Sequence, residues 1–224
     1  MLALDSDLMP GLAVSLGVPQ YRDAMLLDAV ERNDSGRWRL RRGIGPVRAV
    51  ERYSVAAPDS VRLLQAGKVG ARGLPEILGS INGFYQVLHR ISRVRTFEDW
   101  AIVGDLPAGP RQPAFDWAPY AETLLVVVEP TWQSALTARR IARIVRARGR
   151  TVLPVANKVE NTADTAYVEQ LLGERVVAAV PEDEAVAAAE QLGVAAIDHA
   201  PGSPAVAAIA ALAAKLERQY AHER

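Results

Sequence analysis

The stretch Met1-Leu2-Ala3-Leu4-Asp5-Ser6-Asp7 decides the fold of this chain. Apolar residues followed by two acids are typical of a buried β-strand that ends in carboxylates. A second stretch of the same design, Trp100-Ala101-Ile102-Val103-Gly104-Asp105, runs directly into Leu106-Pro107-Ala108-Gly109. A proline and a glycine after a strand-ending acid make a turn whose backbone can approach a phosphate closely. Together, the two strands predict a site for phosphate and a metal ion.

The composition is that of an ordinary globular domain. Its 224 residues are enough for one α/β domain with a full core. Lys+Arg and Asp+Glu are both 26, so the zero net charge favours neither nucleic acid nor an anionic membrane as a partner. The chain has no cysteine, which excludes disulfides, thiolate metal sites, iron–sulfur clusters and cysteine nucleophiles. It has no apolar run long enough to span a bilayer and no signal-peptide pattern, so we expect a cytoplasmic protein.

The order of apolar and amphipathic segments predicts an α/β fold. After residue 100 we expect strands at 100–105, 124–128, 151–156, 175–180 and 194–197, with helices at 115–120, 132–148, 163–172, 184–192 and from Pro204 onward. Before it we expect a strand at 61–67, helices at 12–16, 21–30 and 75–94, and irregular structure at 33–52. The apolar run 124–128 is typical of a strand that is covered on both faces. The pattern predicts a mostly parallel sheet with helices on both faces, in a single domain over residues 1–224.

Polar residues gather at or just beyond the expected strand ends, namely Asp5, Asp7, Asp105, Glu129, Asn157 and Asp183. Ligands of open α/β sheets bind at the carboxyl ends of the strands, so this convergence predicts a binding site. An acid in that position can hold Mg²⁺ or orient a nucleophilic water. Any one acid could instead cap a helix or face solvent. For Asp7 and Asp105 together, we favour the functional interpretation.

Several segments, in order, resemble the MinD/ParA-type P-loop ATPases, which include the nitrogenase iron protein and the maturation ATPases of carbon monoxide dehydrogenase. The string 104–109 is similar to the switch II segment of that family, and residues 2–7 with 12–18 are similar to its second strand and switch I. Residues 129–140 resemble the stretch after the central strand in the carbon monoxide dehydrogenase maturation branch. Residues 155–159 resemble the base-recognition motif, and 180–183 resemble the loop over the base. The likeness covers nearly the whole chain and is weaker between Tyr21 and Val94.

The resemblance implies an ATP-binding and ATP-hydrolysing switch protein that uses ATP and Mg²⁺, forms a homodimer and controls an unidentified client protein. Asp7 and Asp105 would be catalytic and would hold the metal ion: Asp7 would activate the attacking water, and Asp105 would hold Mg²⁺ through water. The resemblance also implies that the nucleotide is bound by Asp5, Pro107, Ala108, Gly109, Asn157, Lys158, Pro181 and Asp183. Asn157 would hydrogen-bond adenine.

The chain departs from the family pattern at the phosphate site. The string K-G-G-x-G-K-S/T, whose backbone amides cradle the phosphates, does not occur in it. Gly67-Lys68-Val69-Gly70 lacks the upstream glycines and the following hydroxyl. In the family, the strand before that string lies between those matching 100–105 and 124–128. We therefore expect an N-terminally truncated reading of a longer gene that binds ATP weakly or not at all. An in-frame stop just before residue 1, with no glycine-lysine loop, would contradict this.

Two other functions are open. One is a degenerate, non-catalytic scaffold of the same fold. The other is a DNA-binding partition-type protein that uses the basic cluster Arg37-Trp38-Arg39-Leu40-Arg41-Arg42, with Arg48 and Arg52 nearby. For this cluster we favour a solvated face, a hairpin or a partner contact, because no aromatic–basic repeat continues it. Metal delivery through a Cys-x-Cys pair, as in nickel-binding maturation ATPases, is not expected in a chain without cysteine.

Overall fold

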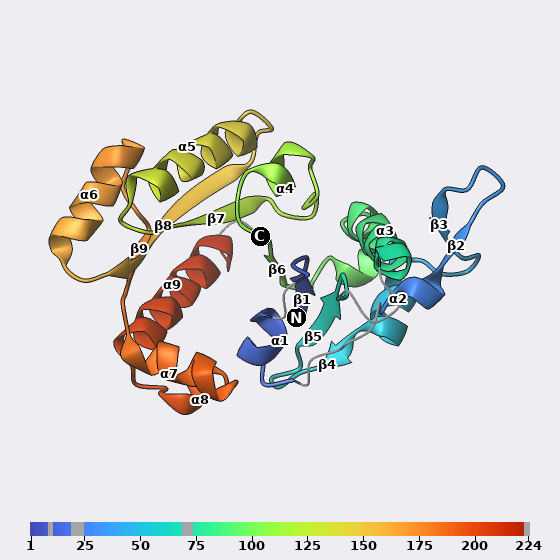
Figure 1. Ribbon diagram of the computed structural model, residues 1–224, viewed down its shortest axis with the longest axis horizontal. Helices are drawn as coiled ribbons and strands as arrows, with labels where there is room; N and C mark the ends of the chain where they lie inside the picture. Colours follow the sequence, from blue (N-terminus) through green and yellow to red (C-terminus); the bar gives the residue numbers. More distant parts are fainter. Residues whose placement is uncertain (9–10, 19–24, 69–73, 222–224) are drawn as a thin grey trace. The chain divides into compact units, whose positions relative to one another are not determined.

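The computed structural model describes residues 1–8, 11–18, 25–68 and 74–221. They form two compact units (Figure 1), each built around its own sheet. Unit 1 consists of Met1–Ala108 and Phe115–Ala121, and unit 2 consists of Gly109–Ala114 and Glu122–Arg224. The predicted α/β class, with parallel strands and covering helices, is confirmed.

The sheet of unit 1 has the strand order β4-β5-β1-β6. The three strands β5 (Arg62–Gln65), β1 (Leu2–Asp5) and β6 (Ile102–Asp105) are parallel, and β4 (Val55–Ala56) pairs antiparallel with β5. The buried strand predicted within the first seven residues is therefore present as Leu2–Asp5, and it lies between β5 and β6.

Helices cover both faces of this sheet. Side chains alternate along a strand, so Leu2 and Leu4 lie on one face of β1 and Ala3 lies on the other. Leu2 and Leu4 join the main core with Phe84 of α3 (Leu74–Ile91), whereas Ala3 packs with Ala13 of α1 (Gly11–Ser15). A 3-10 helix, η2 (Arg95–Phe97), connects α3 to β6.

Residues 33–52 were expected to be irregular, and this prediction is wrong. They contain the second strand of a hairpin, β2 (Val30–Arg32) with β3 (Trp38–Leu40), followed by α2 (Pro46–Tyr53). The hairpin is held from far along the chain, because Gln86 of α3 donates to the Trp38 carbonyl at 3.2 Å and accepts from the Leu40 amide at 3.2 Å. The helix expected at 21–30 is also wrong where it is described, since η1 (Leu27–Ala29) precedes β2; residues 21–24 lie outside the described residues.

The basic cluster is used within this hairpin. Arg39 forms an ion pair with Glu31 at 2.8 Å, the Arg32 guanidinium lies 4.4 Å from the centre of the Trp38 ring, and Arg41 donates to the Val30 carbonyl at 3.1 Å. Two arginines of the cluster, Arg39 and Arg41, therefore make contacts within a hairpin, which is one of the interpretations that the sequence favoured.

The sheet of unit 2 contains β7 (Thr123–Val128), β8 (Thr151–Val159) and β9 (Ala178–Pro181), all parallel and in that order. The helices are α4 (Arg111–Ala114), α5 (Trp132–Arg146), α6 (Thr162–Leu172), α7 (Glu184–Leu192), α8 (Ala196–His199) and α9 (Pro204–Ala221). Side-chain oxygens of Thr131, Asn161 and Asp183 cap the starts of α5, α6 and α7.

Three expectations for the chain after residue 108 are wrong. Residues 194–197 are not a strand, because the Ala195 carbonyl accepts from the backbone amides of Asp198 and His199 and starts α8 instead. The helix expected at 115–120 lies earlier, in α4. Strand β7 is not covered on both faces within unit 2, since Leu125 and Val127 are 43% and 58% exposed.

The exposed residues of β7 lie on the face of the sheet that α9 covers at the neighbouring strands β8 and β9. Val155 and Val180 pack against Ala205 and Leu212 of α9, and Val127 is the register partner of Val155. Thus α9 covers β8 and β9 on that side but leaves most of β7 open. No helix in the described part of the chain is long and apolar enough to cross a membrane.

Candidate functional site

The strand register gathers polar side chains at the carboxyl ends of three neighbouring strands in unit 1. Asp5 of β1 is the register partner of Gln65 in β5 and of Asp105 in β6. The backbone amide of Ser6 donates to the Asp105 carbonyl at 3.0 Å, which holds the next residues of the chain beside β6. The predicted convergence of Asp5, Asp7 and Asp105 at one sheet edge follows from this register.

Asp5 lies beneath the site rather than at its surface. It is 1% exposed, Gln65 Nε2 donates to its Oδ2 at 2.9 Å, and the backbone amide of Asp7 donates to its Oδ1 at 3.1 Å. Because both carboxylate oxygens of Asp5 have donors within the chain, Asp5 anchors the loop that carries Asp7.

Burial and the neighbouring charges shift the pKa values of the ionisable groups in this cluster. Burial raises the pKa of Asp5 above its usual range, although the hydrogen bonds from Gln65 and Asp7 oppose the rise. The pKa of Asp105 is also raised, first by burial and then by the charges of Asp5 and Asp7. Burial lowers the pKa of Lys68, and the Asp5 charge opposes this. The carboxylates therefore raise one another's free energy at neutral pH, and a bound cation would relieve that repulsion.

Replacing Asp5 with asparagine is expected to raise the thermal midpoint at pH 8 by a few degrees. A carboxyl whose folded-state pKa is raised destabilises the fold above that pKa, and the cost disappears as pH falls towards the unfolded value of about 3.8. The asparagine amide carries no such charge. Its Oδ1 still accepts from the Asp7 amide, and its Nδ2 can donate to the unpartnered Gln65 Oε1 once the Gln65 amide turns over, so the gain should shrink as the pH falls from 8 in circular dichroism melts. The exposed Asp99→Asn control should change little over this pH range, and a lower midpoint for Asp5→Asn at pH 8 would contradict the assignment.

Three buried polar atoms at this sheet edge have no hydrogen-bond partner within the described part of the chain: Ser6 Oγ, Gln65 Oε1 and Lys68 Nζ. Such an atom costs about 1–3 kcal/mol when nothing binds it, so these atoms indicate a ligand or its water shell. Gln65 and Lys68 were not among the predicted site residues. The end of the strand expected at 61–67 could have indicated Gln65, since it lies beside Asp5.

The residues of this edge fit Mg²⁺ held through water better than a closed metal centre. Within the described residues, no group of three or more His, Cys, Asp or Glu side chains could hold a metal ion directly. Mg²⁺ commonly keeps several waters and takes only one or two protein carboxylates. The two acids expected to hold the ion, Asp7 and Asp105, match that number.

The predicted phosphate turn follows Asp105. Gly109 has a φ of +94°, a conformation in which other residues are strained, and a Cβ added there would meet nothing within 4 Å. The glycine is thus required by the backbone and not by a lack of space. Pro107 and Ala108 precede it and are part of unit 1.

A second group of predicted residues lies in unit 2, at the end of β8. Lys158 has a φ of +54°, and the pairing of β8 with β9 shifts register between Asn157 and Val159. A non-glycine residue in this conformation at a β-bulge is strained, and bulges re-aim the neighbouring side chains. Lys158 Nζ forms an exposed ion pair with Glu129 Oε1 at 2.9 Å. The Asn157 amide makes no side-chain hydrogen bond to other described residues, so both its donor and its acceptor are available.

Two backbone amides donate hydrogen bonds to Asp183 and hold its side chain in place. Its carboxylate accepts from the backbone amides of Ala185 at 2.9 Å and Ala205 at 3.0 Å, which joins the starts of α7 and α9. These two hydrogen bonds, that from Ala205 first, lower the pKa of Asp183. Each carboxylate oxygen of Asp183 therefore already accepts one hydrogen bond within the chain, which fixes the 181–183 loop against the start of α9.

The fold of this chain is that of the MinD/ParA-type P-loop ATPases. The septum site-determining protein MinD from Pyrococcus horikoshii OT3, solved in complex with Mg-ADP, matches it with a TM-score of 0.72 and 18% identity, over 100% of this chain and 85% of that one. In sequence, the chain is 25% identical to the carbon monoxide dehydrogenase accessory protein CooC from Rhodospirillum rubrum, over 97% of this chain and 86% of that protein.

The chain is also 28% identical to an uncharacterised ATP-binding protein from Methanocaldococcus jannaschii, over 71% of this chain. It spans 56% of the length of that relative. No protein-family model matches the chain. The resemblance to the MinD/ParA-type ATPases, with the carbon monoxide dehydrogenase maturation branch among the similar sequences, therefore rests on both fold and sequence.

Proposed function

We propose that this chain is part of a cytoplasmic, MinD/ParA-type switch protein that binds and hydrolyses ATP, and that residues 1–224 by themselves bind ATP weakly or not at all. The observation that carries the proposal is the register of β5, β1 and β6, which brings Asp5 beside Asp105 and anchors Asp7 at the same edge. In an open α/β sheet, this edge is where ligands bind. The similarity to a MinD bound to Mg-ADP makes a nucleotide and Mg²⁺ the ligands of choice.

Each acid has a separate role in this proposal. Asp7 orients the attacking water, and Asp5 fixes the loop from which Asp7 projects. Asp105 would hold Mg²⁺ through water, and the turn 107–109 would respond to the terminal phosphate. When bound, Mg²⁺ would neutralise charge on the phosphoryl group in transfer. Ser6, Gln65 and Lys68 supply the buried polar atoms that a hydrated ion or a phosphate oxygen would satisfy.

In this proposal, the end of β8 recognises the base. The Asn157 amide can donate to and accept from an adenine edge, and the strained Lys158 backbone sets its direction. Pro181 would pack on the base. Residues 1–224 would act as one nucleotide-binding domain, and the intact protein would dimerise and control a client.

Calorimetric titration of the 224-residue chain with Mg-ATP tests whether these residues bind nucleotide without the family's phosphate loop. We expect a dissociation constant weaker than about 1 mM, because the backbone cradle of a K-G-G-x-G-K-S/T loop is not in this sequence. A millimolar or tighter affinity would contradict this.

If the reading frame continues upstream into such a loop, the longer protein should bind and hydrolyse ATP. Asp7→Asn in that protein should then lower kcat by about 100-fold or more while leaving the affinity for ATP nearly unchanged. Loss of binding together with hydrolysis would instead assign Asp7 to ground-state binding.

The alternative is a non-catalytic scaffold of the same fold, favoured by the absence of the phosphate-loop string from these residues. A scaffold would bind its partner with no ATP and show no hydrolysis in any form of the gene product. The two functions therefore differ in whether nucleotide changes partner affinity.

A further inference from the structure

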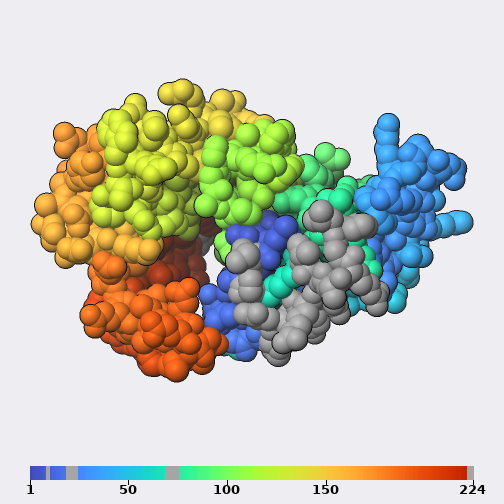
Figure 2. Space-filling model, in the orientation of Figure 1, coloured from blue at the N-terminus to red at the C-terminus, as the bar shows by residue number. Residues whose placement is uncertain are grey.

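One stripe of α5 combines an aromatic side chain with arginines. Trp132, Leu136, Arg139, Arg143 and Arg146 recur at alternating spacings of four and three residues, so they lie on the same side of the helix. Trp132 is 60% exposed, and Arg139 and Arg143 are also exposed. Figure 2 shows the yellow-green side chains of α5 at the surface beside the orange ones of α6. We call Trp132, Leu136, Arg139 and Arg143 the Trp–Arg stripe.

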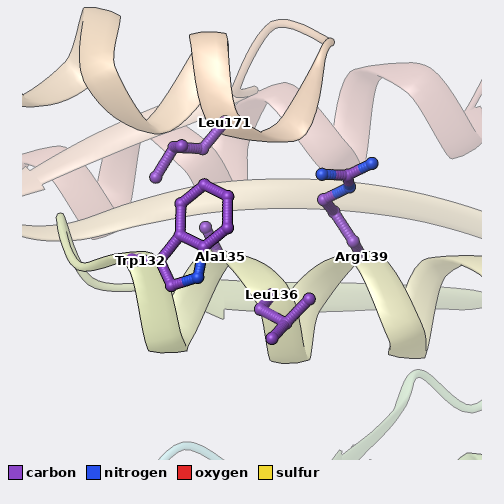
Figure 3. A pocket seen from close by; sticks show the side chains of 5 residues that line it. All are labelled: Trp132, Ala135, Leu136, Arg139 and Leu171. Carbon is purple, nitrogen blue, oxygen red and sulfur yellow. The ribbon is translucent and has the colours of Figure 1, made fainter.

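The aromatic end of the stripe borders a shallow pocket between two helices. It is lined by Trp132, Ala135, Leu136 and Arg139 of α5 and by Leu171 of α6. Figure 3 shows the indole of Trp132 rising from α5 towards Leu171. The pocket encloses no space for a small molecule, but an apolar side chain of a larger partner can pack against its open rim beside Trp132.

The arginines of the stripe lack acidic partners. Arg139 and Arg143 form no ion pair with any described residue, whereas the neighbouring Arg146 pairs with Glu174 at 2.6 Å. The acids of α6 are engaged by backbone amides, since Asp164 accepts from Glu160 and Glu169 accepts from Val176. The stripe is thus a positive surface with an apolar pocket at one end.

From this arrangement we propose that the Trp–Arg stripe binds an acidic segment of a partner protein. An apolar side chain of that segment packs beside Trp132, and its carboxylates pair with Arg139 and Arg143. Tryptophan and arginine are the residue types that dominate protein–protein binding energy, and arginine pairs with carboxylates through two parallel hydrogen bonds.

The arrangement favours a protein over a membrane or nucleic acid. The apolar side of α5 is buried in unit 2 through Ala138, Ala142 and Val145, so the helix cannot lay that face into a bilayer. Duplex DNA would match the arginines but offers no protruding apolar group for a pocket that two leucines line. Only an acidic segment with an apolar side chain uses both halves of the stripe.

Fluorescence anisotropy with a labelled synthetic peptide tests the proposal. The probe carries leucines at helical spacing among glutamates, and a matched peptide has serines in place of the leucines. We expect the leucine peptide to bind in a saturable manner and the serine peptide to bind at least about tenfold more weakly. Trp132→Ala and Arg139→Glu should each weaken the leucine peptide about tenfold or more.

Two control variants carry the same chemical changes elsewhere in unit 2. Ile197→Ala removes a side chain of α8 that is 60% exposed, and Arg218→Glu reverses an exposed charge on α9. Both should leave the affinity within about twofold. All variants change exposed residues, and circular dichroism verifies their folding.

Equal losses in the control variants, or no loss in Trp132→Ala, would overturn the proposal. The proposal would also be overturned if a DNA duplex or phosphatidylserine vesicles bound more tightly than the peptide and Arg139→Glu abolished that binding. The measurement needs no nucleotide, so its failure is distinguishable from failure of the proposed ATPase function.

Discussion

Replacing Gly104 with alanine is expected to destabilise the protein by about 3 kcal/mol or more. A Cβ added to Gly104 in β6 would lie 1.8 Å from Tyr120 Oη, 2.8 Å from its Cζ and 3.1 Å from its Cε2. The Tyr120 ring packs against the main core of unit 1, so relieving the clash requires the ring or β6 to move. Because β6 carries Asp105, the change should also disturb the candidate site.

A thermal melt or a urea titration measures this loss. For a chain of this size, each kcal/mol lowers the thermal midpoint by roughly 2–4 °C. Gly202→Ala is the matched control, because a Cβ added there meets nothing within 4 Å, and it should leave the midpoint nearly unchanged. A Gly104→Ala protein as stable as this control would show that Tyr120 does not occupy the space beside β6.

Tyr120→Phe provides a sharper test of the same contact. The Tyr120 hydroxyl is buried with no hydrogen-bond partner among the described residues, and burial raises the pKa of Tyr120. Removing the hydroxyl alone should therefore be neutral or stabilising, by up to about 1 kcal/mol. In the double variant it removes the closest clash, so part of the Gly104→Ala loss should be recovered. Additive effects of the two changes would contradict direct contact.

Gly83→Ala in α3 is expected to lower the free energy of unfolding by about 1–2 kcal/mol, although alanine has a higher helical propensity than glycine. In a helix interior open to solvent, the same change would gain about 1 kcal/mol. Here the added Cβ would lie 2.9 Å from Val30 Cγ1, 3.2 Å from Leu26 Cβ and 3.4 Å from the Leu26 carbonyl oxygen. Leu26 and Val30 are buried in the same core, so they have little room to retreat.

Urea unfolding of Gly83→Ala measures the balance between propensity and packing. Gly79→Ala, one turn earlier, is the comparison. Its nearest contact, at 2.7 Å, is Leu27 Cδ1, which is the end of a flexible and only partly buried side chain. Gly79→Ala should therefore cost less. A more stable Gly83→Ala protein would mean that the hairpin does not pack on this face of α3.

Much of the fold could be predicted because it depends on local patterns. Helix α5 was expected from its periodicity, and Thr131 caps its start. The strands at 1–7, 61–67 and 100–105 end in polar residues, and those ends meet at one sheet edge. Local patterns were not enough for 33–52, where the short strand β3 is held because Gln86 of α3 binds both Trp38 and Leu40. Residues 194–197 have strand-like composition, but the turn that starts at Ala195 makes them helical.

The candidate site, too, could be predicted only in part from the sequence. That acids follow apolar strands, and that these strands end at one edge of a parallel sheet, could be read along the chain, because strand polarity and side-chain alternation are local properties. The burial of β6 could not, since this strand lies at the side of the sheet with Val103 55% exposed. Which of these acids can meet a ligand depended on packing between distant segments. Asp5 is an anchor because Gln65 lies beside it in the neighbouring strand, and Asp183 is a cap because the Ala205 amide reaches it from α9. Hydrogen-bond partners and burial come from segments far apart in sequence, so only the folded chain distinguishes an exposed carboxylate from one that is already engaged.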